Sequence, residues 1–344
     1  MFYCDEVRPL KALILFDKER RAENLEKDLW KSATERSIDV CFNLEDSENY
    51  DLIILVGDDC FFLNWFHRLG FSRPFLPVGL DESESFIAEV SLNDLNTVFE
   101  KLSEGEFLLE ENPVIRGRVD GGGEIHAVNE VAVFPSKSAV IMEYELWLDG
   151  EFVWRDRGDG IIISTPLGST AYSLSAGGPL VFPGSRVFVV TPVNSLDPAR
   201  RPLIVPENRK IILEEISSRV SVEVVADGVK RLKVSGNISV AKYRKSLKLV
   251  RLAKTSSLGL RIYRKAKLSE RLVDVPPSAK LVYKVLEYEG PLTQKDITSK
   301  TFLPVRTVRR ALQLLEKRGL VGEVPNIRDL RQKLYYIKGR EKSG

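Results

Sequence analysis

Apolar runs in the first third of the chain alternate with a charged, amphipathic stretch. Runs at residues 10–16, 38–42 and 51–56 predict three short strands. Residues 19–36 are charged but carry apolar positions at helical spacing, which predicts a surface helix packed on a sheet. Strand–helix–strand order favours a parallel sheet, so we expect an α/β domain over residues 1–106.

The patterning then changes from helices to strands. Residues 61–69 and 91–103 predict two more helices. From residue 107 onwards, short strand patterns are separated by turn residues, as at Asp149-Gly150 and Asp227-Gly228. We expect a β-rich, β-sandwich-like domain over residues 107–253.

A third region follows a basic linker at residues 254–277, which ends in two prolines. Ser278 and Thr293 are suited to cap two helices, and Pro304 to begin a third. The third helix has an apolar stripe made of Val305, Val308, Leu312 and Leu315. Residues 320–321 and 334–337 then predict the two strands of a wing.

This order resembles a winged helix-turn-helix domain, here over residues 278–340, in which the third helix enters the major groove of DNA. The resemblance implies double-stranded DNA as a partner and contacts from the third helix and the wing. The residues predicted to make them are Arg306, Thr307, Arg309, Arg310, Gln313, Arg328, Arg331 and Lys333. The alternative is a small helical appendage with a solvated basic face, used for self-association.

Charge supports the first of these interpretations. The net charge of the 344 residues is only +2. Residues 271–344 nevertheless hold 16 Lys/Arg against 8 Asp/Glu, while the remainder holds 35 against 41. A basic end on a nearly neutral chain is the electrostatic footprint that phosphate binding requires.

Composition excludes several classes of protein. No run approaches the ~18 apolar residues of a membrane span, and the first residues do not resemble a secretory signal. The three cysteines are widely spaced, which argues against a disulfide framework and for a reducing, cytoplasmic setting. The two histidines, His67 and His126, lie in no Cys/His cluster, so no metal ligands are expected from the protein.

The most informative stretch is residues 159–178, a short apolar run followed by small and hydroxylated residues. The run at 160–164 predicts a buried strand that breaks at Thr165-Pro166. The residues after it offer backbone N–H groups, hydroxyls and room for a flat polar ligand. An ordinary Gly/Ser-rich connection between two strands would look similar.

Residues 165–179 resemble the signature of the NAD kinase family, Thr-Pro-x-Gly-Ser-Thr-Ala-Tyr-Ser-x-Ser-Ala-Gly-Gly-Pro, and meet every fixed position in it. The resemblance implies phosphorylation of the adenosine 2′-hydroxyl of NAD by ATP or polyphosphate, with Mg²⁺ on the donor phosphates. It also implies a homodimer or homotetramer. The residues it points to for binding the dinucleotide are Asn129, Glu130, Asp159, Thr165, Gly168, Ser169, Thr170, Ala171, Tyr172, Ser175 and Asp227.

The resemblance also implies a catalytic role for Asp58, with Gly57 and Asp59 on the phosphate-donor side. The family has Gly-Gly-Asp-Gly here, and this chain departs from it at Val56, Asp59 and Cys60. A carboxylate at position 59 adds negative charge where a triphosphate would lie.

Two functions are therefore consistent with the sequence, and a third possibility combines them in a kinase that also regulates. The first is an NAD kinase, favoured by the signature and by the retained Asp58. The second is a weakly active or inactive NAD(P)(H)-sensing regulator that binds DNA through its C-terminal domain, favoured by the altered Gly-Asp loop.

Overall fold

A computed structural model describes ten stretches of the chain, residues 9–16, 23–44, 50–71, 73–80, 85–137, 140–252, 275–289, 291–301, 303–326 and 332–337. The chain divides into two compact units. We call residues 1–80 with 87–258 the main unit, and residues 259–344 with 81–86 the C-terminal unit.

The main unit begins with a mostly parallel sheet in the order β2-β1-β3-β4-β19-β6, with β5 paired to β4. Its strands are β1 (Leu10–Phe16), β2 (Ile38–Cys41), β3 (Leu52–Val56), β4 (Phe75–Gly79), β5 (Val90–Ser91), β6 (Leu108–Asn112) and β19 (Leu247–Arg251). Alternate side chains of β1 enter two different cores, as expected for a sheet covered on both faces.

Helices cover both faces of this sheet. Helix α1 (Glu23–Thr34) and helix α3 (Leu95–Ser103) contribute to one core, and helix α2 (Asp59–Leu69) contributes to the other. A short 3₁₀ turn, η3 (Leu92–Asp94), leads into α3. The predicted α/β layer is therefore confirmed, although α2 begins two residues before the predicted start at residue 61.

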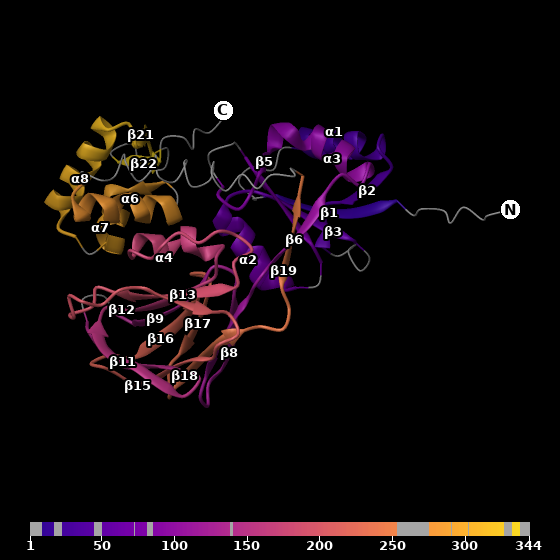
Figure 1. Ribbon diagram of the computed structural model, residues 1–344. Helices are drawn as coiled ribbons and strands as arrows, with labels where there is room; N and C mark the ends of the chain where they lie inside the picture. Colours follow the sequence, from indigo (N-terminus) through magenta and orange to yellow (C-terminus); the bar gives the residue numbers. More distant parts are fainter. Residues whose placement is uncertain are drawn as a thin grey trace. The chain divides into compact units, whose positions relative to one another are not determined.

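The boundaries of that layer differ from the predicted residues 1–106. Strand β6 and strand β19 pair with each other, and β19 also pairs with β4, so both belong to the first sheet (Figure 1). Both lie inside the range predicted for the β-rich domain. Because the two partners are separated by more than 130 residues, local patterning does not reveal their pairing.

Between these strands the chain forms two six-stranded antiparallel sheets. One has the order β11-β10-β15-β18-β7-β8, the other β14-β13-β12-β9-β16-β17, and side chains from both fill one shared core. This confirms the β-rich, sandwich-like second layer. The strands are β7 (Ile115–Val119), β8 (Gly123–Ala127), β9 (Glu130–Pro135), β10 (Met142–Leu148), β11 (Glu151–Gly158), β12 (Gly160–Ser164), β13 (Val187–Val193), β14 (Leu203–Pro206), β15 (Ile211–Ser218), β16 (Val222–Ala226), β17 (Lys230–Lys233) and β18 (Ile238–Lys242).

Both predicted Asp-Gly hairpins are present. Asp149 and Gly150 have φ values of 50° and 87°, and Asp227 and Gly228 have 52° and 72°. Two successive residues with positive φ form the tight turn that matches strand twist, which is why Asp-Gly is favoured there.

Among its described residues, the C-terminal unit has three helices (Figure 1) and a three-stranded antiparallel sheet in the order β20-β22-β21. Its core combines side chains from all three helices with Leu320 and Val321. The elements are α6 (Pro277–Glu289), β20 (Leu292–Thr293), α7 (Gln294–Thr301), α8 (Val305–Lys317), β21 (Val321–Pro325) and β22 (Lys333–Ile337).

Two details of the third predicted helix differ from expectation. Val305 is 52% exposed, so the buried stripe of α8 consists of Val308, Leu312 and Leu315 together with Ala311. Pro304 is the N-cap rather than the first helical residue. The predicted contact residues Arg328 and Arg331, and most of the predicted linker, lie outside the described residues.

None of the helices in the described stretches combines the length and apolar character needed to cross a membrane.

Candidate functional site

The first part of the candidate site lies where β3 runs into α2. The N–H of Gly57 donates to the carbonyl of Val78 in β4 (3.0 Å), which fixes the turn to the sheet. Asp58 is the N-cap of α2, and its carboxylate accepts a hydrogen bond from the N–H of Phe61 (2.8 Å). The structure thus places Asp58 at the carboxyl end of a parallel strand and at the positive end of a helix, where open α/β sheets bind ligands.

Asp59, in the first turn of α2, has a structural contact. Its Oδ1 accepts a hydrogen bond from the N–H of Ile87 (3.2 Å), and the carbonyl of Ile87 accepts one from Arg251 (2.8 Å). Arg251 is buried and forms ion pairs with Glu110 (3.0 Å) and Glu89 (3.6 Å). The carboxylate at position 59 therefore helps to hold the segment around Ile87.

In the predicted Asn129-Glu130 pair, Asn129 lies between β8 and β9 and Glu130 begins β9, and both residues are 7% exposed. The carbonyl of Asn129 accepts a hydrogen bond from the N–H of Thr165 (2.8 Å). The carbonyl of Val128 accepts one from the hydroxyl of Thr165 (2.6 Å). Thr165, the first residue of the signature, therefore holds this segment through two of its backbone carbonyls.

Asp227 holds the same segment through its backbone N–H groups. Its Oδ1 accepts from the N–H groups of Asn129 (2.8 Å) and Glu130 (3.0 Å), and its Oδ2 from that of Val128 (2.9 Å). The Nε2 of His67 lies 2.9 Å from the same Oδ2, and the side chain of Asp227 is fully buried. This carboxylate organises the backbone around Asn129 and is itself covered.

Hydroxyl groups hold the signature in place. The hydroxyl of Thr165 accepts from the N–H of Gly168 (3.0 Å), and the buried hydroxyl of Ser169 donates to the carbonyl of Pro166 (2.7 Å) and accepts from the N–H of Val181 (3.1 Å). These contacts build a 3₁₀ turn, η4 (Gly168–Thr170), and a single helical turn, α4 (Tyr172–Ser175). Farther along, Thr170 donates its hydroxyl to the carbonyl of Leu167 (3.1 Å), Ala171 is half-buried, and Ser175 is exposed.

Gly168 approaches the backbone of the Asn129 segment very closely. A Cβ at position 168 would lie 2.0 Å from the carbonyl oxygen of Asn129 and 2.4 Å from its carbonyl carbon. Only glycine permits this approach without moving main chain. The close approach joins the signature to the Asn129-Glu130 segment at van der Waals contact.

Tyr172 connects this group of residues to Asp159. Tyr172 is 42% exposed. Its ring stacks on the ring of Phe134, with the two ring centroids 5.7 Å apart. Burial raises the pKa of the Tyr172 phenol, and the carboxylates of Glu130 and Asp159 raise that pKa further. Tyr172, Glu130 and Asp159 therefore share one electrostatic environment beside the signature.

Asp159 opens β12 and is held by the loop that follows β13. The side-chain amide of Asn194 donates to its carboxylate (2.7 Å), and its own N–H donates to the carbonyl of Val193 (2.9 Å). The next residue of that loop, Ser195, donates its hydroxyl to the buried carboxylate of Asp156 (2.6 Å). The orientation of Asp159 thus depends on how firmly this loop is anchored.

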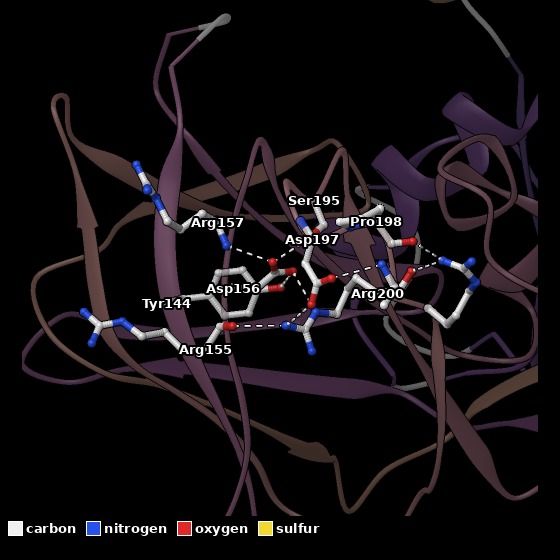
Figure 2. A network of polar contacts seen from close by, with 10 residues as sticks. Tyr144, Arg155, Asp156, Arg157, Ser195, Asp197, Pro198 and Arg200 are labelled. Carbon is white, nitrogen blue, oxygen red and sulfur yellow. Dashed lines mark hydrogen bonds and ion pairs between the residues drawn. The ribbon is translucent and has the colours of Figure 1, made fainter.

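Figure 2 shows that anchor, a network around Asp156. The phenol of Tyr144 donates to Asp156 (3.2 Å), and the guanidinium of Arg200 lies 3.5 Å from it. Burial, aided by Asp156, raises the pKa of the Tyr144 phenol far above its ordinary value, so it remains a donor. Arg200 also pairs with Asp197 (3.0 Å) and lies over the ring of Trp154 at 4.7 Å, which fixes it as a rigid support.

His67 belongs to this region although no sequence motif points to it. The residue lies in the last turn of α2, and its partner Asp227 is 160 residues away. The only local signal is a lone histidine near a helix C-terminus, which does not specify a partner. The other histidine, His126, pairs with Glu124 (2.9 Å), and burial lowers its pKa.

Comparisons with known proteins agree with these features. The model of the ATP-NAD kinase C-terminal domain matches residues 128–252. The NAD kinase of Methanopyrus kandleri is 34% identical over 215 residues, which are 62% of this chain and 77% of that protein. An NAD kinase of Porphyromonas gingivalis is 31% identical over 208 residues, which are 60% of this chain and 72% of that protein.

Solved structures give the same result. An NAD kinase from Archaeoglobus fulgidus in complex with ATP superposes with a TM-score of 0.64 at 26% identity, covering 75% of this chain and 99% of that one. Yeast NADH kinase complexed with NADH superposes with a TM-score of 0.61 at 23% identity, covering 74% and 86%, and at that identity supports the fold alone. With the fold, the signature and a relative matched over most of its length in agreement, the chain belongs to the NAD kinase family.

Proposed function

We propose that the chain transfers the terminal phosphoryl group of ATP to the adenosine 2′-hydroxyl of NAD, using Asp58 to orient or deprotonate that hydroxyl. Membership of the NAD kinase family makes the chain a phosphotransferase that acts on NAD. One observation supports the residue assignment most directly. A single carboxylate, Asp227, contacts both the Asn129-Glu130 backbone and the helix that Asp58 caps.

The predicted dinucleotide residues divide into two groups. Thr165, Ser169 and Asp227 have buried side chains engaged with the backbone, so we assign them to building the site. Those we assign to contacting the dinucleotide lie around them, and they are Asn129, Glu130, Asp159, Gly168, Thr170, Ala171, Tyr172 and Ser175. The amide of Asn129 and the carboxylate of Glu130 can recognise donors and acceptors on adenine and ribose.

Phosphoryl transfer depends mainly on positioning and charge stabilisation. A carboxylate at Asp58 supplies a proton acceptor at the end of β3. Gly57 and the N–H groups of the first turn of α2 lie on the side that we assign to the phosphates of the donor. The structural relative from Archaeoglobus fulgidus was solved with ATP, which favours ATP as the donor.

Mg²⁺ fits this arrangement as a donor-bound ion. In the described part of the chain no three His, Cys, Asp or Glu side chains cluster to hold a metal. Mg²⁺ at phosphoryl-transfer sites is usually held by phosphates, waters and one or two carboxylates. Asp58 and Asp59 are the carboxylates at this end of β3, and the ion, when bound, neutralises phosphate charge.

The decisive test is NADP formation by the purified full chain from NAD, ATP and Mg²⁺, with Asp58→Asn purified identically as the control for contaminating kinase. We expect NADP with the wild-type chain and none above background with the variant. Parallel reactions with polyphosphate and with NADH identify the donor and the preferred dinucleotide. Measurable NAD binding without turnover on either donor would refute the kinase proposal.

Replacing Asp59 by Asn tests the charge on the donor side. The amide oxygen of Asn can still accept from the N–H of Ile87, so the segment stays in place while one negative charge is removed. We expect the KM for the Mg²⁺–ATP complex to fall about threefold to tenfold, with the KM for NAD unchanged, because like charge disfavours an anion. A higher KM for the nucleotide, with a steeper Mg²⁺ requirement, would show instead that Asp59 helps to hold the ion.

For the C-terminal unit, we infer a winged helix-turn-helix that binds double-stranded DNA. The order of its elements, α6-β20-α7-α8-β21-β22, is that of the motif, and the charged face of α8 is open to solvent. The exposed polar residues on this face are Arg306, Arg309, Arg310, Gln313 and Lys317, and Thr307 is half-buried beside them. In β22, Lys333 is exposed but engaged by Glu323, so it contributes less free charge.

Replacing Arg309 and Arg310 together by Ala should weaken DNA binding without unfolding the unit, because both side chains are exposed. We expect the slope of log K against log salt to fall by about one for each arginine that contacts a phosphate. Fluorescence anisotropy on a random-sequence duplex at several salt concentrations measures this. Lys280→Ala, which removes an exposed charge from α6, is the matched control. Equal losses in the control and the test variant would contradict a role for α8.

A cytoplasmic location and a homodimer or homotetramer remain part of this proposal. Winged-helix proteins often bind two half-sites as dimers, which is consistent with an oligomer.

A further inference from the structure

The carboxylate of Asp227 receives two kinds of donor on its two oxygens. Three are consecutive backbone N–H groups, those of Val128, Asn129 and Glu130, at 2.8 to 3.0 Å. The fourth is the imidazole of His67, with Nε2 2.9 Å from Oδ2. The pair is shielded from water, since the side chains of His67 and Asp227 are 4% and 0% exposed.

The two kinds of donor come from different layers of the main unit. The three N–H groups belong to the β8–β9 connection and the first residue of β9, in the β-sandwich layer. His67 belongs to α2, which covers one face of the first sheet. Asp227 is therefore a junction between the two layers, and His67 is its contact on α2.

Helix α2 connects His67, in its last turn, with Asp58, its N-cap. His67 follows Asp58 by nine residues, which is about 14 Å along a helix at 1.5 Å per residue. The helix is held rigidly between them, because Phe62, Leu63 and Phe66 are buried in the core beneath. The position of the helix at its His67 end therefore constrains the position of Asp58 at the other end.

We propose that His67 is a positioning residue for the phosphoryl transfer. Through Asp227 it fixes α2, and with it Asp58, against the Asn129-Glu130 segment that we assign to the dinucleotide. This inference rests on the proposed function. An ionised carboxylate only accepts hydrogen bonds, so the hydrogen of this contact is on the Nε2 of His67.

The asymmetry of the junction separates positioning from simple support. Without His67, Asp227 still accepts three backbone hydrogen bonds, so the Asn129-Glu130 segment should keep its place. Without Asp227, those N–H groups and a buried imidazole all lose their acceptor. Loss of His67 should therefore affect turnover more than binding, whereas loss of Asp227 should affect both.

The test compares His67→Leu with His67→Gln, since the side-chain amide of Gln can donate to Asp227 and Leu cannot. For His67→Leu we expect kcat to fall about 10- to 100-fold, the effect of a displacement of ~1 Å at a reacting group, with the KM for NAD within about threefold. His67→Gln should recover most of that loss. His126→Leu, the matched histidine control, should leave kcat near the wild-type value.

Two results would overturn the inference, both measured below the unfolding midpoints of all variants. One is wild-type kcat in His67→Leu. The other is a proportional loss of kcat and NAD affinity that Gln does not recover, which is the behaviour of a residue that only supports the fold.

A second measurement keeps this inference separate from the proposed function. If the wild-type chain makes no NADP, the proposed function fails by itself. Hydrogen exchange then tests the positioning of α2 without any reaction. Peptides covering residues 58–66 should exchange faster in His67→Leu than in wild type, and peptides covering residues 128–134 should not. Unchanged exchange over 58–66 would refute the coupling of His67 to Asp58.

Discussion

Asp58→Asn should eliminate NADP formation while the protein stays folded and continues to bind NAD. Asp58 has two separable roles in this structure, because its carboxylate caps α2 through the N–H of Phe61 and also lies at the carboxyl end of β3. Asn caps a helix about as well as Asp, so the capping role survives the substitution. The substitution removes the carboxylate oxygen that would accept the proton of the 2′-hydroxyl.

We expect kcat to fall about 10⁴-fold, the upper end of the usual contribution of a positioned general base, so NADP formation should not rise above background. The assay is an NADP-specific coupled dehydrogenase reaction, with NAD binding measured by calorimetry on the same preparations. Asp58→Ala is the companion variant. It should lose the same activity and also about 1 kcal/mol of stability, because Ala provides no cap.

Turnover within threefold of wild type in Asp58→Asn would mean that Asp58 serves only as a helix cap. The hydroxyl would then have to be activated by another group, and the assignment of the catalytic residue would be wrong.

Gly168→Ala should disrupt both stability and NAD binding. The added Cβ would lie 2.0 Å from the carbonyl oxygen of Asn129, a backbone atom that cannot rotate away. Relief requires the signature and the Asn129 segment to separate, which strains the hydrogen bonds that Thr165 makes to both sides. Overpacking of this kind costs about 1–3 kcal/mol and sometimes more.

We expect a thermal midpoint lower by about 2–4 °C for each kcal/mol in a unit of this size, and NAD affinity at least tenfold weaker. Differential scanning calorimetry and NAD titration measure the two effects. Gly177→Ala is the matched control within the same signature. Gly177 has φ of 89° but no atom within 4 Å of an added Cβ, so only backbone strain applies there.

If Gly168→Ala binds NAD as tightly as wild type, the contact between the signature and the Asn129 segment does not shape the dinucleotide site. A loss no larger than that of Gly177→Ala would mean that the close approach of Gly168 to Asn129 contributes little to stability or binding.

Elements with a strong local pattern were predicted well from the sequence. Residues 10–16 and 160–164 form strands with the predicted bounds, because each is a compact apolar run between turn residues. Both Asp-Gly hairpins were predicted correctly, since few residues other than Gly, Asn and Asp adopt positive φ readily. The predicted start of α2 is two residues late, because the apolar pattern begins at Phe61 whereas the helix begins after its N-cap, Asp58.

What the sequence did not reveal depends on contacts between distant residues. The pairing of Asp227 with His67 joins residues 160 positions apart, and neither residue carries a local sign of the other. The contact of Asp59 with Ile87 is similar, because it joins residues 28 positions apart that carry no local sign of each other. Residue types and order identified the candidate site, whereas the supports beneath it became apparent only from the structure.

The return of β19 to the first sheet affects how the chain is completed during synthesis. Strand β4 pairs in parallel with β3 and β5 and also with β19, which ends at Arg251, so the N-terminal sheet is unfinished until most of the main unit has left the ribosome. The N-terminal layer cannot act as an autonomous early-folding module, and the sandwich is inserted within it. The C-terminal unit emerges only after that sheet can close.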